Sequence, residues 1–304
     1  MKKQYILYIF LVVAVLAGIV ILAKSSKNPA MVPSGTSTIH VVAAENFYGD
    51  IVQQLGGSHV QVTSILSDPN ADPHEYESSV ADAQAVANAQ IVIENGLNYD
   101  AWMDKLLSAS PNKNRTVLVA GNIANHKLED NPHVWYVIDN MPTIARSVTN
   151  ALKKADPVHA SVFDKNLQDF VASLSPLQNK ITDIHSKYAN TPVALTETIY
   201  LYQTMPEGLD VLTPIAFERA IAEGNDPSAD DVAKTNDQIT KKQVKVLIYN
   251  EQTITPITTN IQNEAKQQNM SIVGVTETLP ANMHYQSWMI TELTNLEQAL
   301  QQTH

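Results

Sequence analysis

The sequence predicts an α/β protein of two βα lobes with parallel-type sheets, joined by one long rigid helix. The chain has 304 residues, of which 44% are hydrophobic, and this length exceeds what one ordinary core accommodates. From residue 39 onward, β-branched runs alternate with helical patterns, and one long apolar stripe separates the two alternating regions. We therefore assign an N-terminal lobe to 38–155, a linking helix to 156–189 and a C-terminal lobe to 190–304.

Residues 1–24 predict a membrane anchor or signal. Two lysines precede an apolar run of 19 residues, 5–23, which is about the length that spans a bilayer as a helix. The residues after this run offer a poor cleavage site, and this favours an uncleaved anchor over a cleaved signal. Residues 25–37 are rich in Ser, Pro and Gly and predict a flexible tether. We expect the rest of the chain outside the cell membrane, held there by the anchor or secreted after cleavage.

The N-terminal lobe is predicted from short β-branched strands and amphipathic helices. One helix, around 47–55, ends at Gly56-Gly57, and a later helix is capped by Ser78 or Ser79. The predicted strands are 39–43, 60–66, 91–93 and 117–119, and a helix at 142–154 closes the lobe.

The linking helix is predicted from apolar residues spaced three and four apart, which form one stripe along a helix. An Asp-Pro pair at 156–157 suits its first positions. From 157 to 188 such a helix would be about 45 Å long. Pro176 is expected to kink it. The stripe consists of Phe163, Leu167, Phe170, Leu174, Leu177, Ile181, Ile184 and Tyr188.

The alternating pattern resumes in the C-terminal lobe, with predicted strands at 193–196, 244–249 and 271–275. Helices are expected near Phe217, Val232, Ile257 and Trp288. The three tryptophans of the chain, at 102, 135 and 288, fall on apolar stretches, so we expect them in the core.

Composition excludes several functions. The chain has no cysteine, so disulfides, thiolate metal sites and lipidated N-terminal cysteines are excluded. The net charge is −11, and four lysines but no Asp or Glu precede residue 38, so the globular part is more acidic still. Such a surface disfavours nucleic acid and attracts cations. No Gly-rich phosphate loop, Ser-His-Asp order or HExxH motif is present, so the sequence gives no sign of an enzyme.

Four side chains lie where a predicted strand or loop would present them as ligands. His74 and His133 each follow a proline, which stiffens the backbone before the imidazole. Glu197 and Glu277 directly follow predicted strands. Alone, each histidine is more often a surface residue and each glutamate as often caps a helix. Together they would form a site of two nitrogens and two oxygens between the lobes, suited to Zn²⁺ or Mn²⁺ rather than Ca²⁺.

Several segments carry a family resemblance, namely AENFYGDIVQQLGG, DPNADPHEYESS, NPHVW, TETIYLY and VTETLPANMHYQSWM. They resemble the metal-binding solute-binding proteins of Zn/Mn ABC importers, called cluster A-I, over essentially all of 39–301. The resemblance implies one metal in the cleft between two lobes. It also implies two His from the first lobe, matching His74 and His133, and two ligands from the second, matching Glu197 and Glu277.

Some features depart from the family pattern. Zinc-dedicated members often carry a His-rich loop before the second ligand, whereas 125–130 reads NHKLED. A Glu at 197 is similar to manganese-leaning members. Glu277 stands where the family often has Asp, which leaves Glu251 and His284 as alternatives for the fourth ligand. The remaining histidines outside the candidate site, at 40, 59, 159, 185 and 304, are interpreted as surface or packing positions.

The expected function is capture of one Mn²⁺ or Zn²⁺ ion per chain and its delivery to the permease of an ABC importer, by a monomer. Ligand identity leans to Mn²⁺, although Zn²⁺ binds most such sites more tightly. Two alternatives remain. A secreted metal-dependent hydrolase would need an open coordination position with bound water. A surface adhesin with incidental metal binding would also suit an anchor and tether.

Overall fold

The computed structural model describes residues 38–68, 76–127 and 131–302, and Thr38–His304 belong to one compact unit. The N-terminal lobe contains a sheet of four parallel strands in the order β2-β1-β3-β4. The strands are β1 (Ile39–Glu45), β2 (Val60–Leu66), β3 (Ile91–Glu94) and β4 (Thr116–Val119). The lobe's α-helices are α2 (Asn46–Gly56), α3 (Val80–Asn88), α4 (Trp102–Ala109), α5 (Ala120–Ile123) and α6 (Met141–Ala155).

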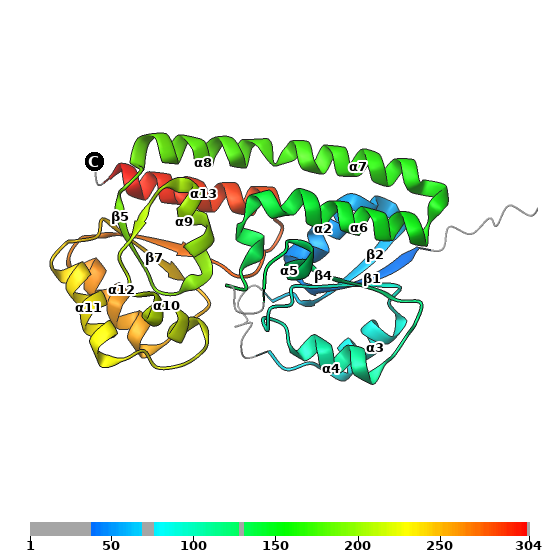
Figure 1. Ribbon diagram of the computed structural model, residues 1–304, viewed down its shortest axis with the longest axis horizontal. Helices are drawn as coiled ribbons and strands as arrows, with labels where there is room; N and C mark the ends of the chain where they lie inside the picture. The colour runs from blue at the N-terminus through cyan, green and yellow to red at the C-terminus, as the bar shows by residue number, and fades with distance from the viewer. Residues whose placement is uncertain (1–37, 69–75, 128–130, 303–304) are drawn as a thin grey trace, which may run out of the picture. The chain divides into compact units, whose positions relative to one another are not determined.

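Side-chain alternation along β1 explains why both faces of this sheet are covered. Ile39 and Val41 belong to the core cluster under α2 and α6, whereas Val42 and Ala44 belong to the cluster under α3 and α4. Figure 1 shows the two helix layers on opposite sides of β1, β2 and β4. Because both faces are buried, the strands are apolar runs, and ligand-binding residues are left to the strand ends.

The C-terminal lobe repeats this plan with the strand order β6-β5-β7-β8, again all parallel. Its strands are β5 (Pro192–Leu195), β6 (Asp210–Val211), β7 (Val246–Asn250) and β8 (Ser271–Val275). Its α-helices are α9 (Leu201–Glu207), α10 (Ile215–Ala222), α11 (Ala229–Thr240), α12 (Pro256–Gln267) and α13 (Tyr285–Gln301). The predicted parallel-type sheets are therefore confirmed in both lobes, while the two-residue strand β6 and helix α9 were not predicted.

Helices in succession occupy the range of the predicted linking helix. A short 3-10 helix, η5 (Pro157–His159), is followed by α7 (Ala160–Ser173) and α8 (Ser175–Tyr188). The helical chain is interrupted at Leu174, two residues before Pro176, which lacks the N–H that a continuous helix would use there. Most of the predicted stripe is buried, including Phe163 and Ile184.

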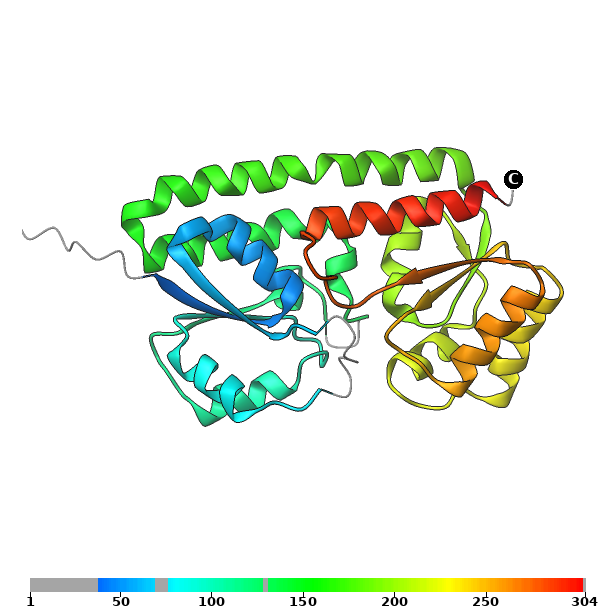
Figure 2. The same cartoon turned by 180° about the vertical axis from the view of Figure 1, so that it is seen from behind.

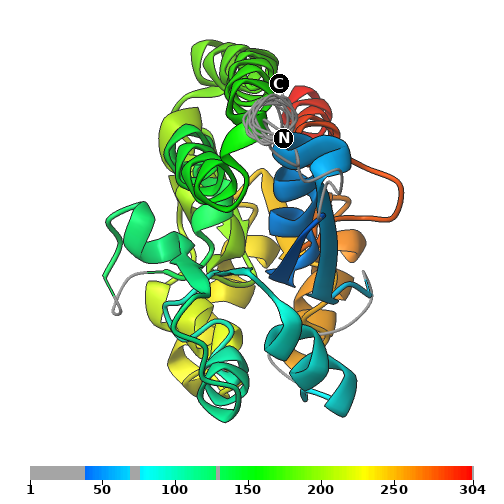
Figure 3. The same ribbon diagram turned by 90° about the vertical axis from the view of Figure 1, so that its right-hand side faces the viewer.

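The linking helices share one core with both lobes. Helix α7 packs against α2 and α6 of the first lobe, and α8 packs against α13, the last helix of the second lobe. Figure 2 shows α13 running beside α8 from behind, and Figure 3 shows the same helices end-on. A single cluster of buried side chains includes Ile51 of α2, Phe170 of α7 and Leu296 of α13. The lobes are thus joined through apolar packing as well as through the chain.

Among the described residues, no helix combines the length and the apolar character needed to cross a membrane. The predicted anchor at 5–23 and the tether at 25–37 lie outside the described residues.

Candidate metal centre

The candidate site begins at the carboxyl ends of three neighbouring strands in the second lobe. Strand β5 ends at Leu195, two residues before Glu197, and β8 ends at Val275, two residues before Glu277. Strand β7 lies between them and ends at Asn250. Because parallel strands end at the same edge of a sheet, the two glutamates and the asparagine are brought together.

His133 reaches this edge from the first lobe. One ligand atom each from His133, Glu197 and Glu277 lies within 4.8 Å of the others, and all three residues are buried, with at most 1% of their surface exposed. The Nε2 atom of His133 lies 3.8 Å from Oε2 of Glu277. One imidazole and two carboxylates, buried together, form a donor set that suits a divalent transition metal.

The side-chain amide of Asn250 lies between the two carboxylates. Its nitrogen is 2.7 Å from Oε1 of Glu197 and 2.5 Å from Oε1 of Glu277. It is also 2.8 Å from the hydroxyl of Thr253. The amide nitrogen of Asn250 has two N–H groups, and three acceptor oxygens lie within hydrogen-bond distance of it. Asn250 therefore positions both carboxylates at once.

Glu277 is also held by Tyr99 and Gln252. The Tyr99 hydroxyl, from the first lobe, donates to Oε2 of Glu277 at 2.7 Å. Burial, reinforced by the charge of Glu277, raises the pKa of Tyr99 well above 10, so the phenol stays a donor. Oε1 of Gln252 accepts the backbone N–H of Glu277 at 2.6 Å and fixes the loop after β8.

Asn131 orients the imidazole. Its Oδ1 lies 2.6 Å from Nδ1 of His133 and accepts the backbone N–H of His133 at 3.1 Å. The amide nitrogen of Asn131 donates to the backbone carbonyl of Thr198 at 2.7 Å, which fixes the amide orientation. The hydrogen-bond network therefore assigns the ring proton to Nδ1 and leaves the lone pair on Nε2, the atom that faces Glu277.

Buried acids of the first lobe hold the loop that carries Tyr99. Asp100 accepts the backbone N–H groups of Asn95 and Gly96 at 2.6 and 2.8 Å. Burial raises the pKa of Asp100 to about 6 and that of Glu45 well above 4.5. The charge of Asp100 adds to the effect of burial on the pKa of Glu45.

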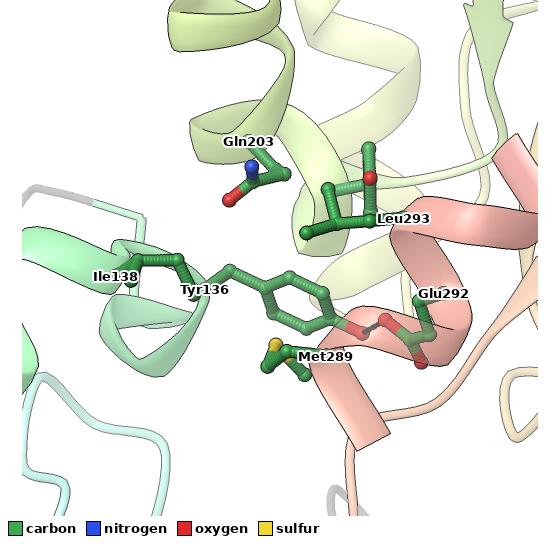
Figure 4. Close-up of a pocket in the computed structure, with 7 residues that line it drawn as sticks. Tyr136, Ile138, Gln203, Met289, Glu292 and Leu293 are labelled. Carbon is green, nitrogen blue, oxygen red and sulfur yellow. Dashed lines mark hydrogen bonds between the residues drawn. The ribbon is translucent and has the colours of Figure 1, made fainter. Parts of the chain in front are cut away.

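A second connection between the lobes joins Tyr136 to Glu292 (Figure 4). The Tyr136 hydroxyl lies 2.8 Å from Oε2 of Glu292 on α13 and 2.8 Å from the carbonyl of Thr276. Oε1 of Glu292 accepts the N–H of Thr276 at 3.0 Å and the indole N–H of Trp288 at 2.8 Å. Burial raises the pKa of Glu292 to about 7. This contact ties the segment after His133 to the residue immediately before Glu277.

The other predicted ligands have different positions. His74 belongs to residues 69–75, outside the described residues. Glu251 is exposed, and its carboxylate lies against Gly274 of β8, where an added Cβ would come within 2.0 Å of it. The side chain of His284 is 72% exposed, and its Nδ1 is bonded to Asp50 at 2.6 Å. Of the three alternatives for the fourth ligand, Glu277 is the one grouped with His133 and Glu197.

Sequence reasoning did not identify Tyr99, Asn131 or Asn250. Asn131 stands in the NPHVW segment and Asn250 directly follows the strand predicted at 244–249, so the sequence position of both was informative. Tyr99 lies in a loop, and its partner Glu277 is 178 positions away. No local pattern could have paired them.

Two parallel α/β lobes joined by helices, with buried imidazole and carboxylate groups where the lobes meet, define a two-lobed binding protein of the solute-binding class. The model of one family, the zinc-uptake complex component A, periplasmic, matches residues 41–299. The chain belongs to this family.

Known proteins place the chain in the same group. It is 28% identical to the metal ABC transporter substrate-binding lipoprotein ScbA of Streptococcus cristatus over 198 residues, 60% of this chain and 62% of that protein. It is 26% identical to the manganese-binding lipoprotein MntA of Bacillus subtilis over 228 residues, 70% of this chain and 71% of that one. The chain thus spans less than two thirds of the length of the Streptococcus relative.

Solved structures share the fold. The solute-binding protein FpvC of Pseudomonas aeruginosa, solved with Mn²⁺, has a TM-score of 0.74 at 20% identity and covers 88% of this chain and 100% of its own. A structure of ZnuA has a TM-score of 0.72 at 19% identity and covers 86% of this chain and 99% of its own. These likenesses confirm the predicted two-lobed fold.

Proposed function

We propose that this chain is the extracytoplasmic solute-binding receptor of a metal ABC importer, which captures one divalent transition-metal ion and delivers it to the permease. The observation that carries the proposal is the buried group of His133, Glu197 and Glu277, in which the two lobes contribute ligand atoms within 4.8 Å of one another. We propose that His74 completes the set of four ligands. The metal is the transported cargo, and the relatives are named for binding and transport.

The charges and donors of the site favour Mn²⁺ or Zn²⁺. Two carboxylates offset the charge of a divalent ion, and the Nε2 lone pair of His133 is ready to coordinate it. Relatives in Bacillus subtilis and Streptococcus gordonii are named for manganese, and one in Streptococcus pyogenes is named for iron. The carboxylate-rich set leans to Mn²⁺, while Zn²⁺ binds most such sites more tightly.

Binding from both lobes suggests how the importer distinguishes the loaded receptor. Hydrogen bonds that cross between the lobes near the site include those from Tyr99 to Glu277, from Asn131 to Thr198 and from Tyr136 to Thr276. A metal joining His133 to the two glutamates would add to these links, and docking on the permease would compete with them. We propose that the receptor acts as a monomer, and that residues 5–23 hold it at the membrane in place of the lipid of its lipoprotein relatives.

The test is a titration of the metal-free full chain in detergent with Mn²⁺ and, separately, Zn²⁺. We expect one tight equivalent of the transported metal, and its loss in Glu277→Gln. The matched control is Glu251→Gln, because Glu251 is a glutamate of the same lobe that is exposed and outside the group. Equal affinities in the two variants would overturn the assignment. If the wild-type chain hydrolyses peptide or phosphoester substrates and His133→Ala does not, the protein is a hydrolase and the receptor function is wrong.

A further inference from the structure

A second group of potential ligands lies where the first lobe meets the linking helices, outside the candidate metal centre. One ligand atom each from His59, Asp156 and His159 lies within 4.8 Å of the others. The sequence analysis interprets both histidines as surface or packing positions. The fold brings them together although 100 residues separate them.

Three separate elements meet at this group. His59 is the last residue of the 3-10 helix η1 (Gly57–His59), which connects α2 to β2. Asp156 follows α6, and His159 ends η5 where α7 begins. The same corner is held by a hydrogen bond from Asn166 to the carbonyl of Leu55, at 2.9 Å, between α7 and α2. The backbone that carries the three side chains is therefore fixed by other contacts.

The side chains are arranged as a compact donor set. The rings of His59 and His159 are stacked, with centroids 3.9 Å apart and planes 29° from parallel. Nδ1 of His159 lies 2.5 Å from Oδ2 of Asp156. The bond to His159 lowers the pKa of Asp156, so the carboxylate is charged at neutral pH.

The group is accessible without movement of the lobes. The side chains of His159 and Asp156 are 25% and 18% exposed, so an ion can enter from solvent and water can complete its coordination. Ligand atoms around a tetrahedral zinc lie roughly 3.3 Å apart, given metal–ligand distances of about 2.0–2.2 Å. Rotation of these partly exposed side chains can bring the ligand atoms from within 4.8 Å of one another to the spacing around a bound ion.

We propose that His59, Asp156 and His159 form a second metal site, which takes Zn²⁺, Ni²⁺ or Cu²⁺ in preference to Mn²⁺. Two imidazoles and one carboxylate favour the later first-row metals, whose affinity for nitrogen ligands exceeds that of Mn²⁺. The site joins the corner before β2 to the start of the linking helices. Bound metal therefore stabilises the folded first lobe. It does not take part in the capture of cargo between the lobes.

The experiment is equilibrium dialysis of the full chain in detergent against Zn²⁺, with bound zinc counted by mass spectrometry. Wild type is expected to bind two equivalents, one tighter than the other. His59→Gln/His159→Gln should weaken one equivalent by more than about 100-fold, because loss of two ligands exceeds the usual effect of losing an outer-shell partner. The control is His40→Gln/His185→Gln, which alters two exposed histidines elsewhere and should retain both equivalents.

Further arms separate this site from the cargo site. Glu277→Gln should lose the metal ion bound at the cargo site and retain the one bound at the second site. The two proposals are therefore tested separately, and either can fail without the other. With Mn²⁺ as the probe, wild type should bind a single equivalent. Asp156→Asn provides a second variant, which should lose the same equivalent as the double histidine variant. Binding of only one zinc by wild type, or equal losses in the control variant, would overturn the proposal.

Discussion

Replacing Asn131 by alanine tests whether the imidazole of His133 must be held in one tautomer for metal capture. In wild type, Oδ1 of Asn131 lies 2.6 Å from Nδ1 of His133 and also accepts its backbone N–H. Asn131→Ala removes the oxygen that accepts both hydrogen bonds. The ring is then free to place its proton on Nε2, the atom that must carry a lone pair to coordinate a metal.

Two independent magnitudes set the expected loss of affinity. Removing the acceptor of a buried N–H costs about 1–3 kcal/mol, or about 5- to 150-fold in a binding constant. Loss of an outer-shell partner of a metal ligand typically costs 10- to 100-fold in metal affinity. We therefore expect binding of Mn²⁺ or Zn²⁺ to weaken by about 10- to 100-fold, with the stoichiometry of the cargo site unchanged.

Calorimetry with a competing chelator measures this loss, and ¹⁵N spectra of labelled histidine report the tautomer directly. Asn112→Ala is the matched control, because Oδ1 of Asn112 also accepts a backbone N–H two residues later, at 3.0 Å, in an exposed turn. It should leave metal affinity unchanged. An Asn131→Ala affinity within threefold of wild type, or an Nδ1 proton retained in its spectrum, would refute the reasoning.

Three further predictions concern other described contacts. Tyr99→Phe removes the 2.7 Å bond to Glu277 and should weaken metal binding by about 10-fold or more, measured by the same titration; an unchanged affinity would mean that Tyr99 only packs. Burial raises the pKa of Glu207 from 4.5 to about 8, so its contribution to folding stability is complete below pH 4.5 and is lost as pH rises toward 8, by at most about 1.4 kcal/mol per unit. Denaturation of Glu207→Gln should show a flatter pH profile over that window, and parallel profiles would contradict the assignment. Phe163→Ala, at a fully buried position of α7, should cost about 3–5 kcal/mol of unfolding free energy in denaturant melts, and a cost below about 1 kcal/mol would argue against the shared core.

The fold was predictable because the hydrophobic pattern of each short segment indicates whether it forms a strand or a helix. The predicted strands at 60–66 and 271–275 have the bounds of β2 and β8. Strand β6, by contrast, has two residues and pairs only with β5, so its sequence carries no periodic signal. Helix α9 was missed because Pro206 lies inside it, and a proline normally argues against a helix interior.

The candidate site divides in a similar way. His133, Glu197 and Glu277 could be proposed because each follows a recognisable segment, and the structure brings these three together. Their assignment as metal ligands stays a prediction, as does the part of His74. The partners that orient them could not be proposed, because a hydrogen bond such as that between Tyr99 and Glu277 depends on the packing of two lobes. Local sequence encodes the ends of the strands, whereas the complete fold determines which side chains meet there.

The chemistry of the orienting partners explains how the centre can hold two carboxylates and still attract a cation. Glu197 and Glu277 lie within 4.8 Å of each other, so when both are charged they repel by about 3 kcal/mol or more at an effective dielectric constant of about 20. Two donors that contact them, Asn250 and Tyr99, are neutral. A neutral donor fixes the position of a carboxylate but does not cancel its charge, as an arginine would. Relief of this repulsion is then available to an incoming divalent ion, and it contributes to the affinity that capture requires.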